Sequence, residues 1–264
     1  MINHGIIEGK RAIDWVGGTI PYEERNPSGD WTAYLPPGEW QRSNLFDTFA
    51  CATFSALNSL EAQHKFLTGQ YREFSDRFTA KMSDTIPALG NTLWRVGDSI
   101  RIDGLLDEAD WPAPPNYDEA AYYSPIPAEK KLKAKEFLKD WNVAYEWVDT
   151  DKISLIKHLK HSPLQVVIPG HAILNFYTNE QIIRYFDSYE PFIKETENIT
   201  WAFKYVLSPI KKTMTSEEVK KIYRLAFYRD PDAGELTHWS GKPLLEFLNT
   251  AITDRANFLN SPIT

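Results

Sequence analysis

The sequence predicts an α+β fold, followed by a small all-α unit at the C-terminal end of the chain. Apolar residues recur at helical spacing between about 49 and 141, whereas residues 143–207 are mostly strand-like runs separated by short turns. Helices and strands segregated in this way indicate an antiparallel sheet with the helices gathered together. A chain of 264 residues, 42% hydrophobic and 25% charged, is long enough for one substantial core and a small appended module.

In the first half, turn clusters give way to helical periodicity. Residues 1–45 are predicted to be loops and strand fragments, because clusters such as Leu35-Pro36-Pro37-Gly38 exclude a long helix. Asp47 or Thr48 is expected to cap the first helix, since both residue types favour the N-cap position. The predicted helices cover residues 49–66, 74–82, 91–104 and 128–141, the last being lysine-rich and expected to face solvent.

The second half alternates strand signals with one helix. Pro163 ends the helix predicted over 151–159, and the turn residues 178–181 join two of the strands that follow. Short turns of this kind favour antiparallel pairing. The predicted strands cover residues 143–148, 164–168, 172–177, 182–187 and 199–207.

The composition changes once more after Ser208-Pro209. Thr215-Ser216-Glu217-Glu218 forms a capping box, which predicts a helix through about residue 229. Two more helices are expected, one near Trp239 and one over 244–258. We therefore predict a main domain over 1–209, with an N-terminal extension over 1–30, and a small helical module over 210–264.

The bulk composition excludes several classes of function. The net charge of −7 and the lack of a long Lys/Arg run argue against a nucleic-acid-binding protein. The N-terminus lacks the pattern of a signal peptide, and no apolar run approaches the roughly 18 residues of a membrane span. We therefore expect binding to neither nucleic acid nor membrane. A single cysteine suits a reducing compartment such as the cytoplasm.

The one cysteine, Cys51, begins an apolar helical pattern. A lone thiol cannot form an intramolecular disulfide, so it is either a small buried hydrophobe or a nucleophile at a helix N-terminus, where the helix dipole favours the thiolate. A cysteine hydrolase also needs an imidazole to exchange protons and a third group to orient that imidazole. The histidines therefore decide between the two uses.

Most of the six histidines are poor partners for Cys51. His158 and His161 are expected to be exposed, on and just after a lysine-rich helix. His64 lies about three and a half turns along the helix of Cys51, which is too far to reach the sulfur. No pair of histidines has the spacing of metal ligands on one helix, so we expect neither a metal nor a cofactor.

His171 fits the role of the imidazole. It follows Pro169-Gly170 at the rim of a predicted strand and is flanked by apolar residues. The next strand pair ends at Asp187, which is 187 − 171 = 16 residues later. A two-stranded hairpin can return the chain over that separation, so Asp187 is expected to lie beside His171.

These residues resemble a known family. Cys51-Ala52-Thr53-Phe54-Ser55, with Glu61 ten positions after the cysteine, is similar to the catalytic helix of papain-like cysteine peptidases, whose pattern is Cys-Trp-Ala-Phe-Ser/Ala followed by Glu at that offset. His171-Ala172 resembles the family's His-Ala, and Asp187-Ser188-Tyr189 resembles its Asn-Ser-Trp. Over about residues 30–207 the resemblance implies a two-lobed papain-like fold and a peptidase. It also implies that Cys51 is the nucleophile, that His171 is the base and acid, and that Asp187 orients His171.

The oxyanion hole is where the chain departs from the family. The family's glutamine precedes the cysteine by six positions, where this chain has Leu45, whereas Gln41 is ten positions upstream. Gln41 would reach the site if the intervening loop is longer, and Asn44 and Asp47 are its rivals. We prefer Gln41, because a neutral donor stabilises a developing oxyanion and a carboxylate repels it. No long inhibitory propeptide is expected before Cys51.

Two functions are consistent with these features. The first is a cysteine peptidase or amidase that acts on a polypeptide or a peptidoglycan-type amide. The second is a catalytically vestigial papain-like module that serves as a structural or binding component, for example of a phage particle or a surface assembly. Ala52, in place of the family's Trp, motivates the second function.

The C-terminal module resembles a small helical module of unassigned function that is found appended to bacterial extracellular and phage-related proteins. The residues that carry this resemblance are Ile222-Tyr223-Arg224-Leu225-Ala226-Phe227-Tyr228-Arg229-Asp230-Pro231-Asp232-Ala233-Gly234 and Trp239. The resemblance implies a virion-associated protein as the alternative to a cytoplasmic one, with a protein partner bound through this module.

Overall fold

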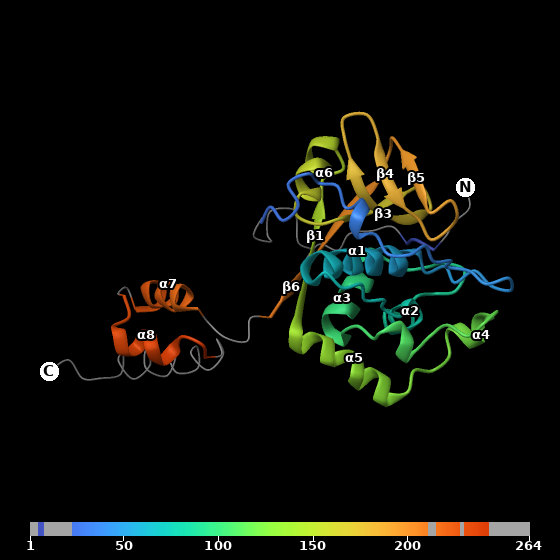
Figure 1. Cartoon of the computed structure of the whole chain (residues 1–264). Coiled ribbons are helices and arrows are strands. Elements are labelled where there is room, and N and C mark those ends of the chain that lie inside the picture. The colour runs from blue at the N-terminus through green and yellow to red at the C-terminus, as the bar shows by residue number, and fades with distance from the viewer. Residues whose placement is uncertain (1–4, 8–22, 211–214, 228–229, 243–264) are drawn as a thin grey trace. The chain divides into compact units, whose positions relative to one another are not determined.

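The computed structural model describes residues 5–7, 23–210, 215–227 and 230–242, and the chain forms two compact units. The first unit is Met1–Ser208 and the second is Pro209–Thr264 (Figure 1). The sequence predicts the division one residue later, between 209 and 210. The helix predicted over 244–258 lies outside the described residues.

The helices of the first unit match the long helices that the sequence predicts to within about two residues at each end. Gly69 and Gly104 follow two of them with positive φ angles of 73° and 80°, which glycine adopts without strain. The short α4 and the two 3-10 turns were not predicted. The elements are η1 Thr32–Tyr34, α1 Cys51–Thr68, α2 Asp76–Met82, α3 Leu93–Asp103, η2 Glu108–Asp110, α4 Glu119–Tyr122, α5 Ala128–Asp140 and α6 Lys152–Leu159.

The start of α1 differs from the prediction, because its N-cap is Ala50 and not Asp47 or Thr48. The two polar side chains instead hold the turn that leads into the helix. Asp47 Oδ1 accepts the N–H of Phe49 at 3.0 Å, and Thr48 Oγ1 accepts the N–H of Ala50 at 3.3 Å. Phe49 takes a left-handed φ of 56°, so the chain reverses sharply before Cys51.

Six strands form one sheet in the order β1-β6-β2-β3-β4-β5. The antiparallel pairs include β2 with β3, β2 with β6, β3 with β4, and β4 with β5. The strand β5 was not predicted, because four residues are too short for a clear alternation of polar and apolar side chains. The strands are β1 Trp141–Val148, β2 Leu164–Ile168, β3 His171–Thr178, β4 Ile183–Phe186, β5 Ile193–Thr196 and β6 Trp201–Pro209.

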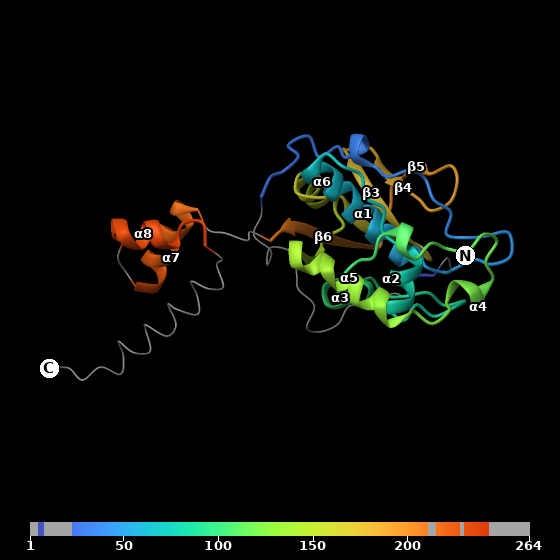
Figure 2. The same ribbon diagram turned by 60° about the horizontal axis from the view of Figure 1, so that its bottom comes forward.

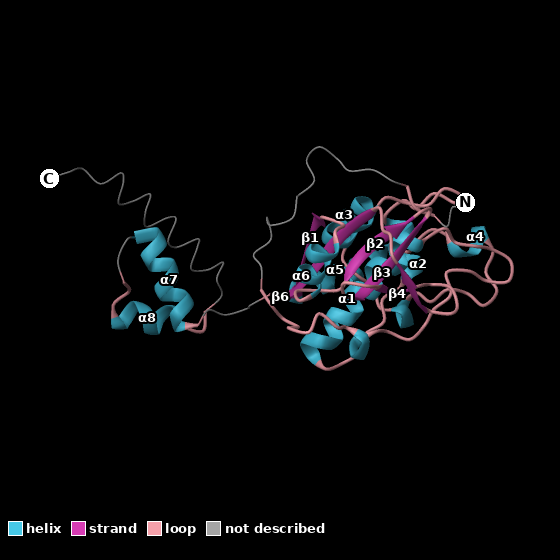
Figure 3. Cartoon of the chain, turned by 90° about the horizontal axis from the view of Figure 1, so that it is seen from above, coloured by secondary structure: helices cyan, strands magenta, loops and turns pink. Residues whose placement is uncertain are grey.

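The helix α1 lies between the sheet and the helices α2, α3 and α5, as two views show (Figure 1, Figure 2). Seen from above, β2, β3 and β4 run side by side (Figure 3). Every residue of α1 from Cys51 to His64 is buried, which is expected of a helix covered on all sides. Burying each large apolar side chain there, such as Leu57 or Leu60, stabilises the fold by about 1.5–3 kcal/mol.

Polar side chains also fix α1 to the sheet. Gln165 on β2 donates from Nε2 to the carbonyl oxygen of Ala52 at 2.6 Å and to Ser55 Oγ at 2.7 Å. Ser59 Oγ donates to the carbonyl oxygen of Pro163 at 3.1 Å. Because these bonds are buried, they hold the first turns of α1 in one position against the sheet.

The prediction that His158 and His161 are exposed is wrong. His158 is 8% exposed and His161 is 1% exposed, and both lie near Lys204, which forms a buried ion pair with Glu146. Lys204 Nζ is 3.2 Å from His158 Nδ1. Burial, together with the charge of Lys204, lowers the pKa of His158 to about 4 and that of His161 to about 3. Both imidazoles are therefore neutral at pH 7 and belong to the core.

The second unit contains α7 Ser216–Phe227 and α8 Ala233–Trp239. Asp232 caps α8 by accepting the N–H of Glu235 at 2.8 Å, and the Glu235 side chain accepts the N–H of Asp232 at 2.9 Å. Within the residues that the structure describes, none of the helices in either unit combines the length and apolar character needed to cross a bilayer.

Candidate active site

Cys51 is the first residue of α1 and is fully buried. Its Sγ accepts the backbone N–H of Ala172, the second residue of β3, at 3.3 Å. This contact joins the N-terminus of α1 to the start of β3, which begins at His171. A thiol in this position experiences the positive end of the helix dipole, which favours the thiolate.

His171 stands at the mouth of the β2–β3 hairpin, where it pairs with Ile168 across the turn at Pro169-Gly170. Gly170 takes a φ of 78°, a conformation that favours glycine. The imidazole is 4% exposed, and its Nε2 donates to Asp187 Oδ1 at 2.7 Å. The sequence-based expectation that the hairpin returns Asp187 to His171 therefore agrees with the geometry.

Asp187 directly follows β4 and is 4% exposed. Its backbone N–H donates to the carbonyl oxygen of Phe192 at 2.8 Å, which closes the turn into β5. Its second oxygen, Oδ2, accepts from Lys194 Nζ at 2.7 Å. Each carboxylate oxygen of Asp187 thus has its own basic partner, His171 on one side and Lys194 on the other.

These contacts set the charges of the group. Burial by itself would lower the pKa of His171, but the hydrogen bonds with Asp187 and with Cys51 outweigh burial and raise that pKa to about 9. Burial by itself would raise the pKa of Asp187, but His171 and Lys194 together hold it below its usual range. At pH 7 His171 is therefore an imidazolium beside Cys51, and Asp187 is an ionised carboxylate.

Gln41 is fully buried, and a small hairpin separates it from Cys51. The bridge between Arg42 and Asp47 encloses residues 43–46, so four residues loop out of the path between Gln41 and the helix. The carbonyl oxygen of Gln41 accepts the N–H of Thr48 at 3.0 Å. The loop that the sequence required for Gln41 to approach Cys51 is therefore present.

The two rivals of Gln41 lie in different surroundings. Asn44 is exposed, and its Nδ2 donates to Asn116 Oδ1 at 3.4 Å. Asp47 Oδ1 accepts from Gln41 Nε2 at 3.2 Å, and Asp47 Oδ2 accepts the hydroxyl of Tyr189. The ring of Tyr189 in turn lies 5.6 Å from the His171 ring. Asp47 therefore links Gln41 to the residues around the imidazole, and it serves as an acceptor in these contacts.

A short N-terminal segment, Gly5 to Ile7, packs against Asn91 and against the turn that precedes Cys51. The N–H of Ile7 donates to the carbonyl oxygen of Asn91 at 2.8 Å, and the N–H of Asn91 donates to that of Gly5 at 2.9 Å. Gly5 also touches the backbone of Phe49 so closely that an added Cβ would lie 2.0 Å from its carbonyl oxygen. Ile6 is 6% exposed and belongs to the same apolar cluster as Cys51. No pattern in the sequence predicts that these residues pack near the start of α1.

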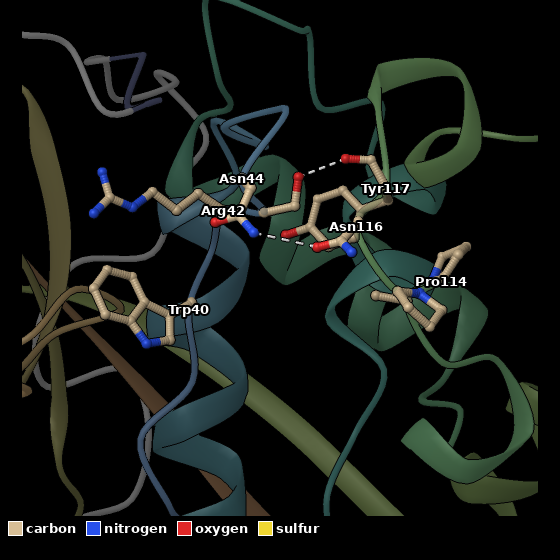
Figure 4. A pocket seen from close by; sticks show the side chains of 9 residues that line it. Trp40, Arg42, Asn44, Pro114, Asn116 and Tyr117 are labelled. Atoms are coloured by element: carbon tan, nitrogen blue, oxygen red, sulfur yellow. Dashed lines mark hydrogen bonds between the residues drawn. The ribbon is translucent and has the colours of Figure 1, made fainter.

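An open cavity of about 460 Å³ lies between residues 40–44 and residues 113–117 (Figure 4). Ser43 Oγ donates to the carbonyl oxygen of Tyr117 at 2.5 Å, so the two segments are bonded across it. Trp40 and Arg42 extend away from Asn116 and Pro114, and the Arg42 guanidinium stacks on the rings of Trp40 and Tyr189 at 4.8 and 5.5 Å. Arg42 therefore connects the lining of this cavity to Tyr189, whose ring lies 5.6 Å from that of His171.

Several carboxyl groups gather in the helical half, and we call them the acidic cluster: Glu39, Glu61, Glu73, Asp76 and Glu108. Three of them, Glu39, Asp76 and Glu108, line a second cavity of about 240 Å³. Burial first, and then the charge of Asp76, raises the pKa of Glu39 to about 12. Burial also raises the pKa values of Glu61, Asp76 and Glu108. Among the described residues, no group of this kind has the geometry of a metal site.

Sequence reasoning missed two parts of the site. Lys194 lies on the strand that was not predicted, and its only sequence signal is the run Phe192-Ile193-Lys194-Glu195-Thr196 after a proline turn. The Gly5 to Ile7 segment precedes the part of the chain that the resemblance covers. Four predicted residues, Gln41, Cys51, His171 and Asp187, lie in one region through the contacts given above.

The structure is similar to solved cysteine proteases, whereas no family model and no curated protein matches the sequence. Digestive procathepsin L 3 from the larval midgut of Tenebrio molitor has a TM-score of 0.55 at 15% identity, covering 78% of this chain and 76% of that chain. The stem bromelain precursor gives 0.51 at 15% identity, with 74% and 77% covered. The proform of the ragweed pollen protease Amb a 11 gives 0.51 at 15% identity, with 67% and 65% covered. The chain therefore has an α+β fold of the papain-like cysteine protease type.

Proposed function

We propose that the chain is a cysteine peptidase that hydrolyses an amide bond of a polypeptide, with Cys51, His171 and Asp187 as its catalytic residues. One observation carries the proposal: Cys51 Sγ accepts the N–H of Ala172, the residue after His171, at 3.3 Å, and His171 donates to Asp187 at 2.7 Å. An imidazolium next to a thiol at a helix N-terminus favours the nucleophilic thiolate. The fold of the solved cysteine proteases supports the same conclusion.

In the proposed reaction the Cys51 thiolate attacks the amide carbonyl carbon, and the new C–S bond pushes the C=O electron pair onto oxygen. The His171 imidazolium then gives its proton to the leaving amine as the C–N bond breaks, which leaves a thioester on Cys51. Neutral His171 next takes a proton from water while the water oxygen attacks the thioester. The C–S bond breaks, the carboxylic acid leaves, and the thiolate–imidazolium pair is restored.

The oxyanion formed in each attack needs donors. We assign the backbone N–H of Cys51 and the side-chain amide of Gln41 to this task, because both are neutral donors. The hairpin over residues 43–46 supports this assignment, since it compensates for the extra residues between Gln41 and Cys51. Asp47 does not serve, because a carboxylate repels an oxyanion.

The test is hydrolysis of an internally quenched peptide library by the wild-type chain and by Cys51→Ala and Cys51→Ser. We expect both variants to lose activity by on the order of 10⁴-fold, because each lacks the nucleophile. Circular dichroism controls for folding. The Ile6→Asp variant is assayed in parallel, so that covering of the thiol is not mistaken for lack of chemistry. Absence of Cys51-dependent cleavage in both the wild type and Ile6→Asp contradicts the proposal.

One observation favours the alternative of a structural or binding module: the thiol of Cys51 is 0% exposed. A nucleophile must meet its substrate, so a permanently covered thiol would be inert. The peptide-library experiment separates the two functions, because a vestigial module cleaves nothing even when the Gly5 to Ile7 segment is displaced. We favour the peptidase. A purely structural cysteine does not require His171 to be hydrogen-bonded to Asp187, or Asp187 to be paired with Lys194.

A further inference from the structure

The carboxylate of Asp187 is held from two directions. Oδ1 accepts from His171 Nε2 and Oδ2 accepts from Lys194 Nζ, each at 2.7 Å. The Asp187 side chain is 4% exposed and that of Lys194 is 26% exposed, so solvent screens this pair less than a surface ion pair. Lys194 therefore touches the group that orients the imidazole, although it does not touch the imidazole or the thiol.

The pleat of β5 explains why Lys194 reaches Asp187. Lys194 pairs with Tyr185 and Ile193 pairs with Phe186, so Asp187 lies just beyond the end of this ladder. Side chains on a strand alternate between the two faces of the sheet. The next residue, Glu195, accordingly pairs with Arg184 at 3.0 Å in an exposed ion pair.

A buried carboxylate without a second cation would have two harmful effects on His171. It would stabilise the imidazolium so strongly that proton donation to the leaving amine becomes slow. It would also leave Oδ2 without compensation in a poorly solvated place, which costs free energy and permits the carboxylate to rotate. The groups that face His171 are Cys51 from α1, Asp187 after β4, and the ring of Tyr189, whose hydroxyl donates to Asp47.

We propose that Lys194 is a positioning residue for the peptidase reaction: its ammonium group fixes Asp187 with Oδ1 toward His171 and offsets the carboxylate charge, so that His171 releases its proton readily. This inference rests on the proposed function for its role in turnover. The electrostatic part concerns Lys194, Asp187 and His171 alone, and it is measurable whether or not the chain cleaves peptides.

The test is an NMR titration of the His171 ring in the full chain, with the resonance assigned from His171→Ala. In Lys194→Met we expect the titration midpoint to rise by about half to one pH unit, because the imidazolium then faces a less compensated carboxylate. Lys194→Arg keeps both the charge and the donor, so its midpoint is expected at the wild-type value. Arg184→Met removes the same charge from the exposed pair on β4 and serves as the matched control, with no shift expected.

Kinetics on a cleaved library peptide provide the second measurement. Lys194→Met is expected to lower kcat by about tenfold with KM unchanged, and Lys194→Arg to restore kcat, because the lysine acts on proton transfer and not on substrate binding. In the Asp187→Asn background, Lys194→Met should shift the midpoint by less than half as much, since Lys194 acts through the carboxylate.

An unchanged His171 midpoint in folded Lys194→Met overturns the inference, as does an equal shift in Arg184→Met. If Lys194→Met does not fold, Lys194→Gln replaces it, since the amide can still donate to Oδ2 while removing the charge. If the chain cleaves no peptide but the titration midpoint of His171 still depends on Lys194, the proposed function is contradicted and the electrostatic inference stands. The two failures are therefore distinguishable.

Discussion

The two halves of the main unit bury ionisable groups in opposite ways. In the β half, Asp187 lies between His171 and Lys194, and these partners hold its pKa below the usual range. In the helical half, the acidic cluster places carboxyls beside one another, and burial raises the pKa values of Glu39 and Glu61. Asp187 is charged at neutral pH, whereas Glu39 retains its proton.

This difference distinguishes a carboxylate that can assist a reaction from carboxyls that only take part in the packing of the core. A compensated carboxylate stays ionised and can orient an imidazole during proton transfer. A buried carboxyl whose pKa is raised in a like-charged cluster serves as a hydrogen-bonding core group, as Glu61 does when its Oε1 accepts the N–H of Phe74 at 2.8 Å. Perturbed pKa values alone would mark both places as sites, so the presence of a charge partner is the more useful criterion.

The largest expected effect compares one residue from each half. His171→Ala should lower peptide hydrolysis by on the order of 10³-fold, because both proton transfers lose their carrier. Glu61→Gln should leave hydrolysis near the wild-type level, because its amide oxygen can still accept from Phe74. Alkylation of Cys51 by iodoacetamide at pH 7, followed by mass spectrometry, checks the same contrast without a substrate. A loss of activity in Glu61→Gln as large as that in His171→Ala would show that the two halves are not distinct.

A smaller effect is expected from Gly5 to Ile7, the segment that packs against the turn before Cys51. Ile6→Asp should speed alkylation of Cys51 by about tenfold, because burying a carboxylate next to the apolar cluster favours release of Gly5 to Ile7. Ile153→Asp is the matched control, since Ile153 is 82% exposed and the same change there buries nothing. Equal alkylation rates in the wild type and Ile6→Asp would show that the segment does not limit access to the thiol.

The smallest effect concerns the stability of the helical half. A carboxyl whose pKa is raised in the folded state keeps a proton that the unfolded chain has lost, so stability falls as pH rises above about 4.5 toward the folded pKa. Between pH 5 and 6.5 we expect the free energy of unfolding of the wild type to fall by about 1–2 kcal/mol relative to that of Glu39→Gln, which lacks the titrating carboxyl. Urea unfolding at several pH values measures the free energy of unfolding of both proteins.

The pH window in this last experiment matters, because His171 also contributes to the pH dependence of the free energy of unfolding. Its folded pKa of about 9 lies above the unfolded value near 6.5, so its contribution is complete below 6.5 and is lost as pH rises toward 9. Below pH 6.5, His158 and His161 act in the opposite sense to the carboxyls, because their lowered pKa values make stability rise with pH there. The difference between the wild type and Glu39→Gln therefore reports the carboxyl, and the total slope does not. A profile in Glu39→Gln parallel to that of the wild type between pH 5 and 6.5 would contradict the raised pKa of Glu39.

Local signals in the sequence account for much of the fold and for the three central site residues. The apolar spacing after residue 49 predicts α1, and Pro169-Gly170 followed by a strand predicts the hairpin that carries His171. These signals are local because helix periodicity and turn chemistry involve residues close together in the chain. The N-cap prediction was wrong because Asp47 and Thr48 bond to Phe49 and Ala50 within the preceding turn.

What the sequence determined by itself is therefore most of the elements and the three residues for which we propose catalytic roles, Cys51, His171 and Asp187. Only the tertiary structure decided how the charge of Asp187 is compensated and which distant segments pack near the start of α1. Lys194 meets Asp187 because β5 pairs with β4, and Gly5 to Ile7 meets Asn91 across more than eighty residues of chain. Such contacts depend on sheet register and on close backbone packing between distant segments, which a local pattern of side chains does not encode.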